Sequence, residues 1–486
     1  MIAEDPKRRT LSEILEKSFS LDLRSLALFR VGLAALVLAD LLQRSRNLTA
    51  FYTAQGVSPL PPFSERSTLP FPLWPHLWND SAVFQTGLFI LSGLVALAMM
   101  AGFRTRWAVF LMWLSTVSLH NRSPVILYGA DQMIGTLLFW SMFLPLGARF
   151  SIDGLIRPAS KDRHRIFSAA TAALCLQTVM LYSSATLSKL ATPEWAAGSA
   201  LHHALIRKIH VTTLAEKLLA VGDPWLAVLN YTVLVIQAAG PIVLFFPSST
   251  PRLRILTILV FCLMHAGFGV FFNLGLFPWA GCAAMLAFLP PVVWKARVST
   301  DSFRDPGLFG RVSSMTVALC LGIAVLLWIS ALPGFAYPPL RPLYQIGSRL
   351  HIRQEWGMFS GPRLVDNKIL RISGELETGG WVTLIDQDKT PPWIHVFLRL
   401  SHFDDIRWRN YFVRLIRKME RAKGDAVDPG GFSRYVCGLW NKNHGRKENF
   451  SRIRFEVFKI PYGGAQHRIL DIRTACNPSD TLARGE

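Results

Sequence analysis

Long runs of hydrophobic residues occupy the first two-thirds of the chain and predict membrane-spanning helices. A helix needs about 20 apolar residues to cross the hydrocarbon core of a bilayer. The third run is short for a full crossing, and Pro278, Pro290 and Pro291 interrupt or bound the eighth, so a count of eight spans stays open beside nine. The nine candidate spans cover about residues 24–43, 82–102, 106–120, 131–148, 168–187, 225–246, 253–273, 276–294 and 313–333.

After Pro333 the pattern changes to short segments in which apolar and polar residues alternate, as they do along half-buried strands. The predicted strands are KILRISGEL, WVTLID, WIHVFLRL, RIRFEVFKI and RILDIRTA, and the predicted helices are RWRNYFVRLIRKMERAK and GFSRYVCGLWNKN. The expected fold is a polytopic α-helical membrane domain with about nine transmembrane helices, followed by a small α+β soluble domain. We place an N-terminal segment at residues 1–23, the transmembrane domain at 24–333 and the α+β domain at 334–486.

Composition agrees with a membrane protein, because 51% of the residues are hydrophobic and only 17% are charged. A globular chain usually carries about 25% charged residues. In a soluble protein the net charge of +20 would suggest nucleic acid as a partner. The chain shows no zinc-finger spacing, RNP-like aromatic run or helix-turn-helix signal. Basic residues of a membrane protein retain loops in the cytoplasm and contact lipid headgroups, so we expect membrane lipid as a partner and no nucleic acid.

The basic residues also orient the predicted spans. With the N-terminus in the cytoplasm, the inside segments hold 18 Lys and Arg residues and the outside loops hold 8. Cytoplasmic loops carry the excess of basic residues, so the count favours a cytoplasmic N-terminus. Nine spans then place the α+β domain outside the cytoplasm, whereas eight would place it inside.

Two cysteines of the α+β domain, Cys437 and Cys476, could pair if this domain faces an oxidising compartment. The sequence alone leaves their redox state open, because geometry decides whether a disulfide forms. The chain contains no CxxC motif and no Cys/His spacing typical of a metal site. We therefore predict no metal.

Polar residues near the ends of four predicted spans indicate a binding pocket. In the nine-span arrangement their helices place them at one depth near the outer surface, which predicts a pocket that opens outward. The set consists of His120, Asn121, Arg122, Asp131, Lys189 and His265. Arg30 and Asp40 lie ten residues apart in the first span, too far to touch, and each is expected to pair with another helix.

Lys189 and His265 each have two interpretations. Lys189 ends the apolar segment LYSSATLSK, where a desolvated amine can act as a base near neutral pH. A lysine at a helix end can equally extend its amine to the membrane interface. His265 lies in the apolar segment CLMHAGFGVFF. It is either an interior histidine that donates to a backbone carbonyl or an acid–base group.

Four stretches of the chain resemble the HTTM superfamily of membrane proteins, which includes vitamin K-dependent gamma-glutamyl carboxylase. The third stretch runs from Tyr182 through Lys189 to Trp195 and Gly198, and the fourth joins His265 to GFGVFFNLGLFPW. The first two stretches are LALFRVGLAALVLADLL with FYTAQGVSPLPP, and SLHNRSPVILYGADQMIGTLLFWSMFLPLGARFSIDG. Together they span most of residues 20–295, and QEWGMFSGPRLVDN looks like the C-terminal part of bacterial members.

The resemblance implies a cytoplasmic N-terminus, an extracytoplasmic C-terminal domain and, for a bacterial relative, the inner membrane. It implies reduced vitamin K or menaquinol as cofactor, with oxygen and carbon dioxide as co-substrates for glutamyl carboxylation. The position of Lys189 matches the base that deprotonates the hydroquinone, and His265 and His120 match active-site histidines. Ser188 stands in place of a second lysine, and the chain lacks the large propeptide-binding region of the animal carboxylases.

Two functional hypotheses follow. The first is a membrane enzyme with Lys189, His265 and His120 as catalytic residues, and a peptide or protein substrate on the outer side. Asn121, Arg122, Asp131, Tyr182 and Trp195 would then shape the pocket. The second is a non-enzymatic membrane scaffold, or a partner in the maturation or export of a secreted peptide. It would dock its partner on the basic α+β domain and would depend on Arg407, Arg409, Arg414 and Arg417. A transporter is disfavoured because the chain shows no inverted repeat.

Overall fold

The chain forms two compact units, each assembled from separate segments. A helical unit lies within Met1–Asp40, Ser92–Val117 and Gly129–Gly361, and a sheet unit lies within Leu41–Leu91, Ser118–Tyr128 and Pro362–Glu486. The structure is a computed structural model. It describes residues 11–60, 73–157, 164–206, 211–247, 249–294, 302–303, 308–332, 341–360, 367–386, 405–421, 430–460 and 465–476.

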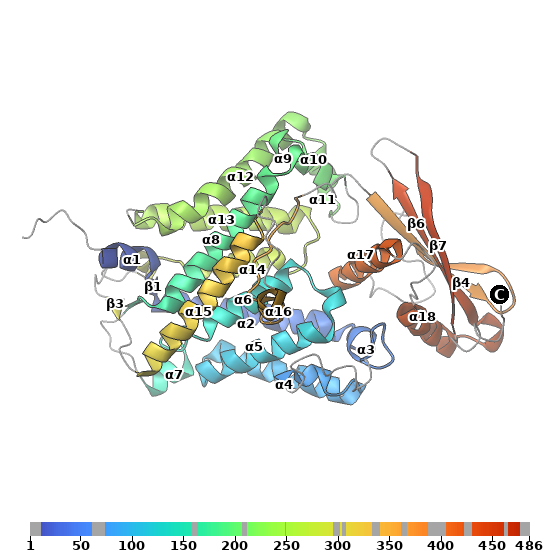
Figure 1. Cartoon of the computed structure of the whole chain (residues 1–486), viewed down its shortest axis with the longest axis horizontal. Coiled ribbons are helices and arrows are strands. Elements are labelled where there is room, and N and C mark those ends of the chain that lie inside the picture. Colours follow the sequence, from blue (N-terminus) through green and yellow to red (C-terminus); the bar gives the residue numbers. More distant parts are fainter. Residues whose placement is uncertain are drawn as a thin grey trace, which may run out of the picture. The chain divides into compact units, whose positions relative to one another are not determined.

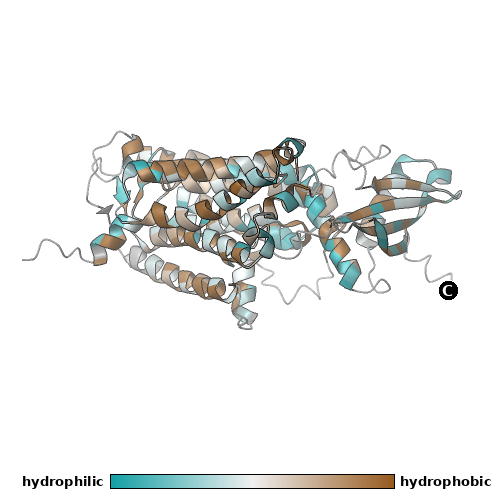
Figure 2. Cartoon of the chain, turned by 90° about the horizontal axis from the view of Figure 1, so that it is seen from above, coloured by the Kyte–Doolittle hydropathy of each residue, from teal (hydrophilic) through white to brown (hydrophobic). Residues whose placement is uncertain are grey.

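Six helices of the described chain are long and apolar enough to cross a membrane. A 20-residue helix is about 30 Å long, which matches the hydrocarbon core of a bilayer. Hydrophobic residues run along these helices in Figure 2. The membrane class predicted from hydropathy is therefore supported. The six are α2 (Leu23–Ser45), α4 (Ala82–Ala101), α8 (Ala169–Leu190), α12 (Asp223–Phe245), α13 (Pro251–Phe271) and α15 (Leu308–Ser330).

The predicted count of nine spans is not confirmed, because the other three candidates form shorter or more polar helices. Helix α5 (Thr105–Arg122) ends in polar residues, α6 (Gly129–Ser141) has 13 residues and α14 (Phe277–Leu286) has 10. Pro145 follows α6, and Pro290 and Pro291 follow α14, so neither helix extends as far as the hydrophobic run. Both helices are largely buried, and membrane proteins tolerate short helices inside the protein.

Helix α8 is the central element of the helical unit and packs against α6, α12 and α15 (Figure 1). Ser168 caps its start, since the Ser168 hydroxyl accepts from the Thr171 amide and the Thr171 hydroxyl accepts from the Ser168 amide. Helix α13 packs against α12 and α14, and α14 packs against α6. Of α8, 14 residues are buried, so its polar side chains face protein rather than lipid.

Arg30 of α2 shows how the helical unit accommodates a buried cation. Its guanidinium donates to the backbone carbonyls of Leu146 at 2.8 Å, Phe150 at 2.6 Å and Met100 at 3.3 Å. These carbonyls lie at the end of α4 and in the segment between α6 and α7 (Ile152–Ile156). The expected pairing of Arg30 with other segments is thus made through carbonyl groups.

Short elements join the connecting segments of the helical unit. A three-stranded sheet, in the order β1-β2-β3, pairs Leu21–Asp22 with Arg165–Ile166 and the latter with Ser302–Phe303. The described residues between Pro193 and Leu219 form three short helices. The remaining elements of this unit are α1 (Leu11–Phe19), α9 (Pro193–Ala196), α10 (Ala200–Leu205), α11 (Leu214–Leu219), η6 (Pro291–Trp294) and α16 (Arg341–Arg349).

The sheet unit contains a four-stranded antiparallel sheet in the order β5-β4-β6-β7. Four of the five predicted strands and both predicted helices are present, and WIHVFLRL lies outside the described residues. Inward-facing Ile453, Phe455 and Val457 are buried and alternate with outward-facing residues. The elements are β4 (Asn367–Leu376), β5 (Trp381–Asp386), β6 (Phe450–Ile460), β7 (His467–Ala475), α17 (Ile406–Arg421), α18 (Gly430–Asn443) and η9 (Arg446–Glu448).

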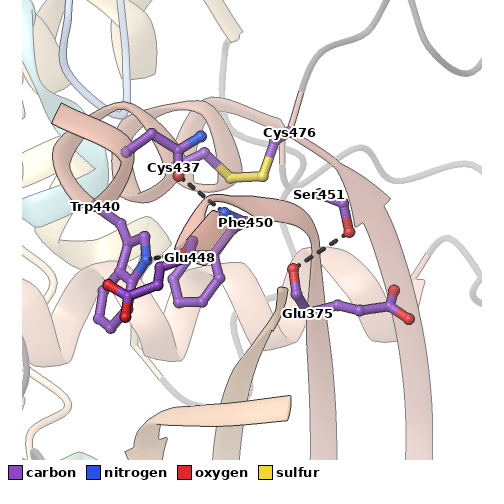
Figure 3. Close-up of a disulfide and its surroundings, with 8 residues drawn as sticks. Glu375, Cys437, Trp440, Glu448, Phe450, Ser451 and Cys476 are labelled. Atoms are coloured by element: carbon purple, nitrogen blue, oxygen red, sulfur yellow. Dashed lines mark hydrogen bonds between the residues drawn. A yellow bond between two sulfur atoms is a disulfide. The ribbon is translucent and has the colours of Figure 1, made fainter. Parts of the chain in front are cut away.

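A disulfide joins Cys437 of α18 to Cys476, the residue after β7. The pairing that the sequence left open is therefore made (Figure 3). Nearby, the Trp440 indole donates to the Glu448 carbonyl at 2.7 Å, and the Ser451 hydroxyl donates to the Glu375 carbonyl at 3.2 Å. The disulfide ties α18 to the end of β7, and the Trp440 hydrogen bond ties α18 to η9.

Loop segments from the first half of the chain complete the sheet unit. The Trp408 indole of α17 donates to the Asn47 side chain at 3.0 Å, and its ring lies 4.4 Å from that of Phe51. Arg414 donates to the carbonyls of Pro124 and Leu127. The segments involved are α3 (Leu48–Tyr52), η3 (Pro75–Leu77) and η4 (Pro124–Ile126).

Candidate functional site

A mostly apolar pocket in the helical unit contains four of the predicted site residues. Tyr182, Ala185 and Lys189 follow one another at helical spacing, so a single face of α8 forms one wall. About 670 Å³ of space inside and at the mouth of the pocket is not filled by atoms. Its lining residues are Leu181, Tyr182, Ala185, Lys189, Trp195, Ala200, Leu201, Ala204, Asn230, Val233, Gln237, His265, Phe268, Phe272, Leu274, Phe277, Met358 and Phe359.

The Lys189 amine is buried in this pocket, with 4% of the residue exposed. Its Nζ donates to the Ala185 carbonyl at 3.3 Å and lies 5.3 Å from the centroid of the Trp195 ring. Among the described residues no carboxylate forms an ion pair with Lys189. The amine is therefore buried against a carbonyl and an aromatic face.

His265 of α13 and Tyr182 of α8 form the second polar group in the pocket. The Tyr182 hydroxyl and His265 Nε2 share a hydrogen bond of 2.8 Å, and both residues are buried. His265 Nδ1 has no hydrogen-bond partner among the described residues. Gly281 of α14 leaves room for the imidazole, because a Cβ at this position would lie 2.4 Å from His265 Nε2. The imidazole is thus bound to a side chain rather than to a backbone carbonyl.

Trp195 connects three parts of the pocket wall. Its indole donates to the Phe359 carbonyl at 2.6 Å, and its own carbonyl accepts from Asn230 Nδ2 at 3.1 Å. The Thr192 hydroxyl donates to the Ser188 carbonyl at 2.9 Å and closes the turn between α8 and α9. This turn brings the Trp195 ring to the Lys189 amine.

The segment that follows α16 forms part of the pocket and was not predicted as a site element. We call residues 350–360 the strap. Its Gln354 exchanges two hydrogen bonds with Gln177 of α8, at 2.8 and 2.7 Å, and Trp140 and Trp356 donate to the same pair of amides. Phe359 of the strap lines the pocket. In the sequence, the polar and aromatic residues of QEWGMF could have indicated that this segment belongs to the site.

A smaller cavity of about 300 Å³ also borders Tyr182. It shares Leu181 and Tyr182 with the main pocket, and Gln177 and Trp356 also line it. Tyr182 therefore lines both cavities, with its hydroxyl bound to His265.

The remaining predicted site residues do not line the main pocket. Asp131 is buried in the first turn of α6 in the helical unit. His120, Asn121 and Arg122 end α5 and belong to the sheet unit, where Arg122 donates to the Ser58 carbonyl at 2.9 Å. The roles assigned to these four residues stay predictions.

A buried histidine lies near Arg122 in the sheet unit. His76 Nδ1 is 2.8 Å from Gln85 Oε1, and the His76 amide donates to Ser118 at 2.9 Å. Burial, together with the charges of Arg122 and Arg44, lowers the pKa of His76 to about 4 against the effect of the Gln85 hydrogen bond. His76 is therefore neutral at physiological pH, and its hydrogen bonds to Gln85 and Ser118 hold this loop together.

The chain matches the model of one known protein family. The HTTM domain matches residues 20–294, more than half of the chain, and this range includes the pocket residues from Leu181 to Phe277. No curated protein and no solved structure matches the chain. HTTM is the domain of vitamin K-dependent carboxylase-like proteins, so the resemblance read from the sequence is confirmed. The chain belongs to the HTTM domain family.

Proposed function

We propose that the chain is a membrane enzyme that binds a lipid-soluble quinol in the Lys189 pocket and uses Lys189 as the base. Carboxylation of glutamyl side chains is the most specific form of this proposal. The observation that carries it is a buried amine with no carboxylate partner among the described residues, in an apolar pocket within the HTTM match. Buried cations are usually paired, so an amine placed in this way favours chemistry over a structural role.

The apolar and aromatic lining of the pocket suits a quinol. Apolar and aromatic side chains such as Phe268, Phe272 and Phe277 would contact the ring and its hydrocarbon tail. The polar groups are few, as is usual for small-molecule sites, where they fix orientation. A bound quinol would supply reducing equivalents to oxygen, and with them a base strong enough to remove a γ-proton of glutamate.

Each polar residue has a task in this scheme. Lys189 accepts the proton of a quinol hydroxyl, with its amine held against the Ala185 carbonyl and the Trp195 ring. His265 and Tyr182 orient the ring from the other polar group, where His265 Nδ1 is available to the ligand. His120 is retained as an acid–base partner on the strength of the family resemblance alone.

The proposed topology has a cytoplasmic N-terminus and an extracytoplasmic C-terminal domain in the inner membrane of a bacterium. The Cys437–Cys476 disulfide supports it, since disulfides persist in oxidising compartments and are rare in the cytosol. The excess of basic residues in the inside segments supports the cytoplasmic N-terminus, and an odd number of spans would then place the C-terminal domain outside. A glutamyl peptide would then approach from the outer side.

Two of the four arginines on which the scaffold alternative depends are buried and cannot form its docking surface. Arg407 and Arg409 of α17 are buried, with 0% and 6% of each residue exposed. Burial also lowers the pKa of Arg409 to about 10, partly offset by Tyr128 and Asp405. Charge reversal at Arg407 or Arg409 would therefore disrupt the sheet unit itself and would not report on docking.

The test is quinol oxidation by the full-length protein. Purified protein would receive reduced menaquinone or vitamin K, oxygen, bicarbonate and glutamate-containing peptides, and quinone epoxide would be measured by mass spectrometry. We expect Lys189→Met to lower epoxide formation at least about a hundredfold, because a general base contributes that much or more. Lys217→Met, on exposed α11, is the matched control and should keep full activity.

Full epoxide formation by Lys189→Met would contradict the assignment of the base. Quinol binding without epoxide in the unaltered protein would indicate that a peptide substrate is missing. Absence of both quinol binding and epoxide would contradict the enzyme proposal as a whole.

A further inference from the structure

Two buried amide groups on α12 have oxygen atoms without hydrogen-bond partners. Asn230 Oδ1 and Gln237 Oε1 have none among the described residues, and the two residues are 0% and 5% exposed. Both line the main pocket. A buried acceptor without a donor costs about 1–3 kcal/mol, so such groups are rare without a functional reason.

The orientation of the Asn230 amide is fixed by its neighbour. Its Nδ2 donates to the Trp195 carbonyl at 3.1 Å, which leaves Oδ1 as the free atom. The Lys189 amine lies over the face of the Trp195 ring. The free Asn230 acceptor therefore belongs to the same end of the pocket as the proposed base.

Gln237 belongs to the other end. It follows Asn230 by seven residues, which is about two turns and about 10 Å along the helix axis, so both residues share one face of α12. One turn further, Gly240 packs on the ring of Phe261, whose centroid lies 4.5 Å from that of Tyr182. Gln237 thus lies toward the Tyr182–His265 pair.

The pocket therefore offers hydrogen-bond acceptors at two ends of an apolar chamber. This spacing suits a ligand with a flat apolar body and hydroxyl groups on opposite edges. A dihydroxy ring can donate to both amide oxygens, whereas the oxidised dicarbonyl ring has acceptors only. At Asn230, whose Nδ2 is held by the Trp195 carbonyl, a ring carbonyl would face Oδ1 as a second acceptor, so the oxidised form would lose affinity.

We propose that Asn230 and Gln237 accept hydrogen bonds from the two hydroxyl groups of the ligand and so select the reduced quinol over the oxidised quinone. The inference rests on the proposed function, because it concerns the ligand of the same pocket. It assigns a specificity role to α12 that is separate from the chemistry at Lys189. Release of the oxidised product follows from the same preference.

The test is equilibrium binding without turnover. Full-length protein, kept free of oxygen, would be titrated with reduced menaquinone, with oxidised menaquinone and with the dimethyl ether of the quinol, which lacks both donors. We expect the quinol to bind at least tenfold more tightly than either of the others. This comparison uses the unaltered protein and does not depend on any variant folding.

Gln237→Met removes the acceptor and keeps the side-chain length. It should weaken quinol binding about three- to tenfold, the equivalent of one hydrogen bond, and leave the dimethyl ether bound as tightly or more tightly. Thr232→Val is the matched control, because Thr232 lies on the exposed side of α12 and donates only to the Val228 carbonyl. It should change none of the three affinities.

Equal affinity for the three ligands in the unaltered protein would overturn the inference while leaving the quinol pocket in place. An equal loss of affinity for all three ligands in Gln237→Met would also overturn it. A bound water or side-chain packing would then explain the presence of the amide. Failure of every ligand to bind the unaltered protein would overturn the inference together with the proposed function.

Discussion

At the scale of single residues, the pocket depends on glycine as much as on its polar side chains. A Cβ on Gly281 would lie 2.4 Å from His265 Cε1 and Nε2 and 2.6 Å from Nδ1. Contacts below 3.0 Å require one of the partners to move. The imidazole position, and with it the Tyr182 hydrogen bond, is therefore set by the absence of a side chain on α14.

Gly281→Ala should displace the His265 imidazole and destabilise the protein by about 1–3 kcal/mol, which is typical of an overpacked core. Alanine alone would favour the helix by up to about 1 kcal/mol, so a loss identifies the steric cause. Thermal unfolding in detergent measures the change. Gly267→Ala is the control, because a Cβ there meets nothing within 4 Å.

A second variant separates this steric cause from a general defect of α14. His265→Ala removes the group that the new methyl would strike. In that background Gly281→Ala should cost little or nothing further, as expected for residues that interact directly. Additive losses in the double variant would contradict the account of Gly281.

The sequence identified some of the pocket residues and missed others for a definite reason. Lys189 and His265 stand out because ionisable residues are rare in apolar helices. Asn230 and Gln237 are single neutral amides in an apolar helix and carry no motif. They stand out because their side-chain oxygens have no hydrogen-bond partner among the described residues, which only the three-dimensional arrangement reveals.

At the scale of elements, hydropathy located the long helices but not the ends of the short ones. A run of apolar residues predicts burial, and burial in lipid and burial in protein give the same signal. Helices α6 and α14 lie inside the helical unit, so their length follows packing and nearby prolines rather than bilayer thickness. The strap was missed because an extended segment of 11 residues has no periodicity to detect.

The strap should depend on its paired amides. Gln354→Leu removes the acceptor of the buried Gln177 Nε2 and one of the donors to Gln177 Oε1, which costs about 1–3 kcal/mol of stability. Because Phe359 lines the pocket and accepts from Trp195, the same change should weaken quinol binding. Thermal unfolding and ligand titration of the variant measure the two effects.

The pairing of Gln177 with Gln354 predicts a particular pattern of losses. Gln177→Leu and Gln354→Leu combined should destabilise the protein by less than the sum of the single changes, since each single change already breaks the pair. Ser360→Ala, at the end of the strap, should have little effect because, among the described residues, its hydroxyl donates to the Gly357 carbonyl alone. Strict additivity would mean that the two amides act independently.

At the scale of the whole molecule, the disulfide links the fold of the C-terminal domain to the orientation of the chain. Cys437 and Cys476 are separated by 39 residues, and closing a loop of this length stabilises a domain by about 4 kcal/mol in the chain-entropy model. Such a bond persists only where the compartment is oxidising. The redox state of this pair therefore reports which side of the membrane the domain faces.

We expect Cys437 and Cys476 to resist alkylation in freshly isolated membranes and to react only after reduction, as peptide mass spectrometry can show. The double variant Cys437→Ala with Cys476→Ala should unfold at a lower temperature, whereas Cys320→Ala, at a thiol that the described structure leaves unbonded in α15, should change little. Free thiols at both positions before reduction would place the domain in the cytoplasm. With the proposed cytoplasmic N-terminus, the chain would then have an even number of spans, and a glutamyl substrate from the outer side would no longer reach this domain.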